Sequence, residues 1–207
     1  MVLGEDMDIN SLTVNAASPG TDVVLQSTGG YTLTINSAAA VTTTAGSPAA
    51  TIHAPLDFTA ANATIAVNSS NPLTLTGAVG GDSITKGGSG RLVLSAANTY
   101  TGSTTVNGGT LQLGNGGTTG ALPATSAVSL ASGATFAVNR SDTVTQGTHF
   151  SASPISGAGS FQQSGTGTTV LTAANTYSGT TTVAAGKLSI SSESNLGANP
   201  ASPDPTH

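Results

Sequence analysis

The sequence predicts an all-β fold, namely a parallel β-helix (solenoid). Three observations predict it. Short runs of alternating apolar and polar residues recur along all 207 residues, turn-forming residues separate them, and one segment is written twice. We expect about 9–11 coils, which at the roughly 4.8 Å spacing of a strand ladder gives a rod on the order of 45–50 Å long.

The strands are expected where apolar and polar residues alternate, because that period places every second side chain on one face. Gly, Asn, Asp, Ser and Pro, which favour turns, lie between these runs. No window keeps the apolar stripe of an amphipathic helix. The expected strands lie at residues 11–16, 22–27, 31–36, 63–68, 72–77, 91–95, 110–114, 127–131, 135–139, 168–172 and 187–191.

The repeated segment decides between a solenoid and other all-β folds. GRLVLSAANTYTGSTTVNGGTLQL, from Gly90, returns from Gly167 as GTTVLTAANTYSGTTTVAAGKLSI, with more than half of its positions identical. This 77-residue offset is much longer than the intervals between the strands that Leu94, Leu113 and Leu130 mark. One unit therefore holds three to four coils. AANTYTG reads as a corner between strands, with an Asn-led turn that ends at Gly.

We expect a single β-helix segment over residues 1–207. Residues 1–62 form upstream coils with a weaker match, residues 63–139 the first repeat unit, and residues 140–207 a second unit cut short by the end of the sequence. An echo of residues 63–68 in 134–139 at a shorter offset places extra residues, near TQGTHF, in a loop of the second unit. Irregular or capped ends are expected at residues 1–8 and 200–207, because bare sheet ends template further pairing.

Small inward side chains are expected to fill a narrow bore, with Thr on the outer face, where its branched Cβ suits a pleated surface. Large aromatic side chains are not expected in that bore, and the chain has only four Phe and three Tyr. Tyr100 and Tyr177 are each expected to cover their own turn with the hydroxyl in water. Stacking of these rings on a sugar is the alternative.

Composition excludes several classes of protein. Charged residues make up 6% of the chain, with a net charge of −5, and the four basic residues, Lys86, Arg91, Arg140 and Lys187, are scattered. Nucleic acids need clustered basic residues, so no nucleic-acid partner is expected. No apolar run approaches the length that a membrane-spanning helix needs, so we expect no direct membrane insertion by this segment. The acidic N-terminal residues do not resemble a signal peptide.

The two copies, with the flanks NPLTLTGAVGGDSITKGGSG and TVTQGTHFSASPISGAGSFQQSGTG, resemble the autotransporter-associated β-strand repeat, also called the passenger-associated transport repeat. The resemblance is strong over residues 63–198 and looser before them. It implies a right-handed parallel β-helix, export to the Gram-negative cell surface, and a C-terminal translocator barrel in the parent protein. With neither a signal peptide nor such a barrel in the sequence, we interpret the chain as a fragment of a passenger domain.

No catalytic, cofactor-binding or metal-binding residue is predicted, and no cofactor. Glu5, Asp6 and Asp8 lack the glycine and distal glutamate of a calcium loop. The three histidines, His53, His149 and His207, have no partner at metal-ligand spacing. The absence of Cys excludes disulfides and thiolate sites.

Polysaccharide-cleaving β-helices would need paired carboxylates. Asp57, Asp82 and Asp142 stand far apart in the sequence, and only the first two could approach on neighbouring coils. The segments GGSGR and GNGG are read as turns between strands and not as phosphate loops.

The sequence therefore predicts a structural segment that supports secretion and folding across the outer membrane and forms a cell-surface stalk. An adhesin that binds surface glycans or proteins is the first alternative, and a polysaccharide-degrading enzyme is the second. Exposed aromatic clusters or an acidic cleft would favour the alternatives, whereas a Thr, Ser and Asn face would favour the stalk. A host-surface or self-association partner stays open.

Overall fold

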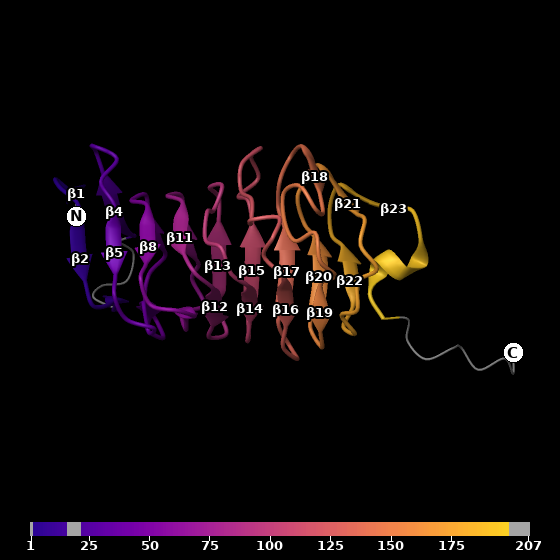
Figure 1. The fold of residues 1–207 in the computed structure, drawn as a ribbon, viewed down its shortest axis with the longest axis horizontal. Helices are drawn as coiled ribbons and strands as arrows, with labels where there is room; N and C mark the ends of the chain where they lie inside the picture. The colour runs from indigo at the N-terminus through magenta and orange to yellow at the C-terminus, as the bar shows by residue number, and fades with distance from the viewer. Residues whose placement is uncertain (1, 16–21, 199–207) are drawn as a thin grey trace, which may run out of the picture.

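The chain winds into an elongated stack of β-coils, with its first coil at one end of the rod and its last described coil at the other (Figure 1). The computed structural model describes residues 2–15 and 22–198. Within them every pairing between named strands is parallel, as a solenoid requires. The predicted parallel β-solenoid is confirmed, and its right-handed sense stays a prediction.

The coils have three sides, which the chain visits in a fixed order. The first side is a nine-stranded ladder: β1 (Val2–Leu3), β4 (Val23–Ser27), β7 (Ala50–Ile52), β10 (Leu73–Leu75), β13 (Arg91–Leu94), β15 (Thr110–Leu113), β17 (Thr135–Val138), β20 (Ser160–Gln163) and β22 (Thr181–Val183). The third side is a seven-stranded ladder: β3 (Leu12–Val14), β6 (Val41–Thr43), β9 (Ala63–Val67), β12 (Ile84–Gly87), β14 (Thr104–Val106), β16 (Val128–Leu130) and β19 (Ser156–Gly157).

The second side lies between these two in chain order and is less continuous. Its early coils contribute β2 (Met7–Ile9), β5 (Leu33–Ile35), β8 (Leu56–Phe58) and β11 (Val79–Gly81). Its late coils contribute β18 (Thr143–Thr145), β21 (Thr168–Leu171) and β23 (Lys187–Ile190). The described chain ends in a single 3₁₀ turn, η1 (Glu193–Leu196), which Ser192 caps.

Nine strands stack on the first side and seven on the third, so the stack makes about seven turns that have a strand on both sides, fewer than the 9–11 coils predicted. The physical reason is coil length. Leu73, Leu92 and Leu111 stack in register at equal short steps along the sequence, as expected. The next two steps in the same register, to Phe136 and then to Phe161, are longer. The coils before Leu73 are also longer. Longer coils at both ends of this short-step region use up sequence without adding rungs.

Inward side chains of all three sides form one apolar core along the bore. The prediction that aromatic side chains would not fit is wrong. Phe136, Phe150 and Phe161 are fully buried, with ring centroids 5.4 Å apart for the first pair and 6.0 Å apart for Phe136 and Phe161. Edge-on ring packing of this kind is favourable. Phe136 and Phe161 stand at the ends of longer register steps, and Phe150 comes from the predicted inserted loop.

Several short strands were missed by the sequence prediction, among them β6, β7, β8 and β18. Each is too short for alternation to distinguish it from a turn. The expected irregular N-terminal end is also wrong in part, because β1 and β2 pair with the next coil. Residues 200–207 lie outside the described chain. The boundaries at residues 62/63 and 139/140 stay predictions.

The two copies of the repeated segment occupy different sides of the rod. In the first copy β12 and β14 pair on the third side, and β13 and β15 pair on the first. In the second copy the equivalent pairs are β20 with β22 on the first side and β21 with β23 on the second. Each strand of the second copy therefore lies on the next side, in chain order, from its equivalent in the first copy. The repeat unit therefore spans three complete coils and one further side, within the predicted three to four.

Candidate functional site

The AANTY corner is held by an asparagine that binds the coils on both sides of it. The Asn98 side-chain oxygen accepts a hydrogen bond from the Val79 N–H at 3.0 Å, and its amide donates to the Ala121 carbonyl at 2.8 Å. Asn98 therefore joins the preceding coil to the following one at a position where regular strand pairing is interrupted. A buried backbone N–H left without such a partner costs about 1–3 kcal/mol.

The second copy repeats this arrangement on its own side of the rod. Asn175 accepts from the Ile155 N–H at 2.8 Å and donates to the Asn195 carbonyl at 2.7 Å. Gln146 adds a contact that the first copy lacks, donating to the Asn175 side chain at 2.8 Å. The predicted Asn-led corner is therefore present in both copies, and its role is to join coils.

Both corner tyrosines point into the rod, which corrects the expectation of wet hydroxyls. Tyr100 and Tyr177 are 1% and 0% exposed. The Tyr100 hydroxyl lies 2.5 Å from the Thr104 hydroxyl, which lies 2.8 Å from that of Ser126, and Tyr177 lies 2.6 Å from Thr181. Burial raises the pKa of Tyr100 to about 12. Because these rings are covered, neither can stack on a sugar.

Lys86 is a buried cation that the sequence analysis did not single out. Its ammonium donates to the carbonyls of Gly87, Gly88 and Gly108 at 2.8 to 2.9 Å. Desolvation lowers its pKa to about 8, because burial disfavours the charged form. In the second copy Gln163 stands at this position and donates to the carbonyls of Gly165 and Gly167. Both side chains satisfy the glycine turn beside them, so a structural role explains the lysine.

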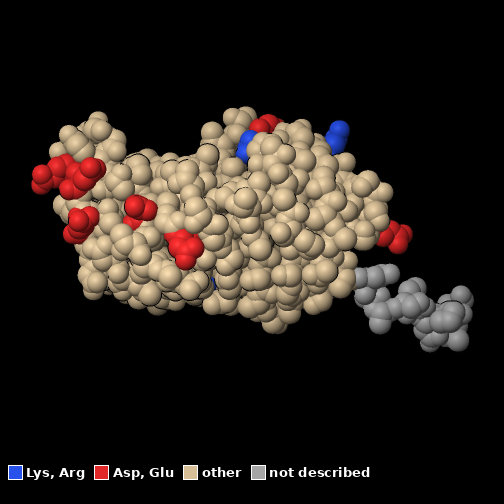
Figure 2. Space-filling model, in the orientation of Figure 1, with Lys and Arg blue, Asp and Glu red and all other residues tan. Residues whose placement is uncertain are grey.

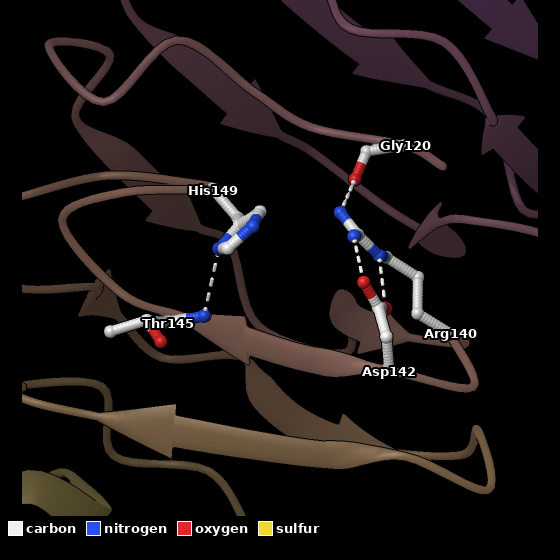
Figure 3. Close-up of polar contacts among 5 residues, drawn as sticks. All are labelled: Gly120, Arg140, Asp142, Thr145 and His149. Carbon is white, nitrogen blue, oxygen red and sulfur yellow. Dashed lines mark hydrogen bonds and ion pairs between the residues drawn. The ribbon is translucent and has the colours of Figure 1, made fainter. Parts of the chain in front are cut away.

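A second buried cation lies in the loop region of the later coils (Figure 3). Arg140 forms a two-point ion pair with Asp142, at 2.9 and 2.6 Å, and donates to the Gly120 carbonyl at 2.8 Å. Arg140 holds the pKa of the Asp142 carboxyl below its usual range. His149 accepts from the Thr145 N–H at 3.0 Å and so closes the loop locally. Asp142 is therefore ion-paired with Arg140 and does not form the carboxylate pair that a polysaccharide-cleaving site would need.

The remaining acidic residues do not converge in the described chain. Residues 1–85 hold six acidic and no basic residues, and acidic groups gather on the N-terminal half of the face shown in Figure 2. Asp57 is in register with Gly80, so Asp82 on the neighbouring coil lies two positions further along. Asp6 accepts from the Thr32 N–H at 2.8 Å. No group of three or more acidic or histidine side chains among the described residues is placed to hold a metal ion.

The other histidines are isolated as well. His53 is exposed and lies 2.6 Å from the Thr76 hydroxyl, and His207 lies outside the described residues. GGSGR and GNGG form turns, and Gly88 and Gly116 there adopt the positive φ that favours glycine. A cavity of about 750 Å³ lies beside η1, and Glu193 is the one carboxylate among its described lining residues.

Comparison with known proteins agrees with the geometry of the two copies. The passenger-associated-transport-repeat family matches residues 84–113 and residues 161–190. These ranges coincide with β12–β15 and β20–β23, the two sets of four strands that pair among themselves.

No curated protein and no solved structure matches the chain in these comparisons. In the described residues no helix has the length and apolar character needed to cross a membrane. The repeat matches and the parallel β-solenoid both fit a segment of an autotransporter passenger. The chain carries two copies of the passenger-associated-transport-repeat.

Proposed function

We propose that this chain is a structural segment of an autotransporter passenger. It supports secretion and folding across the outer membrane and then forms a cell-surface stalk, and a translocator follows it in the parent protein. We also propose that it catalyses no reaction. The family that matches the chain is a structural passenger repeat, and this match supports the proposal.

The self-pairing of each repeat copy is the observation that carries the proposal. The four strands of a copy form two pairs, so that residues 84–113 alone build two rungs on two sides of the rod. In solenoids, stability comes from each coil and its contact with the next. A chain built in this way can cross a membrane unfolded and gain structure coil by coil on the far side.

The buried polar groups fit the same role. Lys86, Arg140, Asn98 and Asn175 all bind backbone carbonyls or amides of their own or neighbouring coils. Each of these polar side chains is therefore committed to holding coils together. A stalk needs such contacts along its length, whereas a ligand site would leave some of these groups free.

An export assay tests the proposal. The chain is placed between a signal peptide and a translocator, and surface display is measured by protease accessibility in intact cells. The double variant Asn98→Ala plus Asn175→Ala removes the coil-joining group from both corners. We expect surface display to fall several-fold at unchanged synthesis, because two buried N–H groups lose their partners.

The matched control is Thr85→Ser plus Thr182→Ser, which changes outward residues of the same two copies. This control should be displayed as well as the parent chain. Equal display of the double Asn→Ala variant, combined with a measured loss of its stability in solution, would contradict a role for coil folding in export.

A further inference from the structure

We propose that the repeat is a cassette, that is, a unit whose docking contacts are made only with the coil before it. Such a unit can be placed on any side of the rod. Each repeat unit then turns the segment that follows it one side further around the axis. The repeat would thus set the direction in which the stalk displays whatever comes next.

The first support is that equivalent corners lie on different sides with the same contacts. In the first copy the corner lies over β11 on the second side, and the N–H groups of Thr99 and Tyr100 both donate to the Val79 carbonyl, at 2.8 and 3.2 Å. In the second copy it lies over Ile155 and β19 on the third side. There Thr176 and Tyr177 donate to the Ile155 carbonyl at 2.8 and 3.1 Å.

The glycine contacts of the corner move with it. The Gly102 N–H donates to the Asp82 carbonyl at 3.1 Å, and the Gly179 N–H donates to the Gly159 carbonyl at 3.0 Å. A Cβ on Gly179 would clash with the Gly159 carbonyl oxygen, so this close approach needs glycine. The motif therefore carries its own docking contacts, and these contacts are the same against two different sides.

The side-chain contacts internal to the copy are also kept. Tyr100 bonds to Thr104 and Tyr177 to Thr181, at the same separation along the chain. Lys86 and Gln163 both donate to the carbonyl two positions ahead, at Gly88 and Gly165. None of these contacts depends on which side the copy occupies.

A deletion in repeat register tests the cassette. Removing residues 90–166 joins Ser89 to Gly167. The second copy's later strands then follow directly on the coil that contains β10, β11 and β12. Thr168–Leu171 would then lie on β10, and Thr181–Val183 on β12, each one side back from its native place. We expect a folded, cooperatively unfolding β-protein, because every corner contact finds an equivalent partner in the coil beneath.

The comparison variant keeps each strand on its native side instead. Removing residues 91–159 joins Gly90 to Ser160 and places β20 on β10, within the first side, but it interrupts the repeat. Circular dichroism and thermal melting are measured on both variants. An unfolded Δ90–166 chain overturns the proposal, whether or not Δ91–159 folds, and a folded Δ90–166 chain supports it.

A disulfide then shows which side the moved strands occupy. The chain has no Cys, so an introduced cysteine pair is the only pair that can form a disulfide within the chain. In Δ90–166 the proposal places Thr182 beside Thr85, and adjacent rungs about 4.8 Å apart lie within the Cα range of a disulfide. Thr85→Cys with Thr182→Cys should cross-link in Δ90–166 and stay reduced in the full chain.

The pair Thr85→Cys with Thr105→Cys, neighbours on the third side, is the positive control in the full chain. A folded Δ90–166 chain that fails to cross-link would overturn the side shift. These measurements need no export, so their outcome is independent of the display assay above.

Discussion

The two repeat copies have similar sequences and very different surroundings. The first is covered by further coils on both sides, and its inward residues Val106 and Leu113 are 0% exposed. In the second copy the equivalent residues, Val183 and Ile190, are 51% and 40% exposed, because no described strand pairs with the far edges of β22 and β23. The same motif is therefore core in one copy and edge in the other.

This difference teaches that a coil's stability depends on its neighbour as much as on its own residues. The hydrophobic contribution scales with the apolar area removed from water, at about 25 cal/mol per Å². In a solenoid that area is supplied by the next coil. Equal substitutions in the two copies should therefore have unequal effects, and the following predictions use that inequality.

The largest difference is expected for the inward residues of the last strands. Leu113→Ala leaves a cavity between β13 and β17 and should lower the free energy of unfolding by about 2–5 kcal/mol. Ile190→Ala should cost about 1 kcal/mol or less, because its side chain is already partly in water. Urea unfolding of both variants measures the two values. Equal losses would mean that another layer covers Ile190 in solution.

The corner tyrosines should show a smaller difference of the same sign. Tyr100→Phe removes the hydroxyl that bonds to Thr104, inside a fully buried set that includes Ser126, and should cost about 1–3 kcal/mol. Tyr177→Phe should cost about 0.5–1.5 kcal/mol, because half-buried Thr181 keeps a bond to the Leu196 carbonyl. Thermal melting compares them, and a larger loss for Tyr177→Phe would reverse the predicted order.

The smallest effect is a pH dependence that comes from Lys86, where the second copy has Gln163 instead. Folding lowers the pKa of Lys86 from 10.5 to about 8. Between these values the unfolded chain binds more protons than the folded one, so stability rises with pH. Lys86→Gln, which copies Gln163, should remove this slope, and Lys187→Gln, at an exposed lysine, should keep it.

Denaturant unfolding between about pH 7.5 and 9.5 measures the slope below the range in which unfolded tyrosine ionises. Above that range the raised pKa of Tyr100 acts in the opposite direction, because the unfolded state releases its proton first. A slope that persists in Lys86→Gln would assign the pH dependence to another group.

Much of the fold follows from sequence patterns. Alternation located β4, β10, β13 and β15, and the offset between Gly90 and Gly167 indicated the size of the unit. The side shift could not be predicted, because it depends on the two longer coils between the copies. Their length comes from loops such as residues 145–150, whose path no periodicity records.

The buried polar groups were also beyond the patterns. Lys86 and Arg140 look like outward charges in an alternating strand, and only the fold shows that glycine carbonyls surround the first and that Asp142 and Gly120 bind the second. The aromatic core was missed for a related reason, since alternation of apolar and polar residues does not record how wide the bore is. One sequence signal did exist for Lys86. The second copy has Gln163, another polar residue, at the equivalent position, which indicates that a polar side chain is buried there.

One cross-linking measurement tests the central claim, that the second copy stands one side further around the rod. In the full chain Gln162 lies beside Ala137 on the first side, whereas an unshifted copy would place it beside Ser129 on the third. The structure predicts that Ala137→Cys with Gln162→Cys forms a disulfide and that Ser129→Cys with Gln162→Cys does not. The opposite result would contradict the side shift.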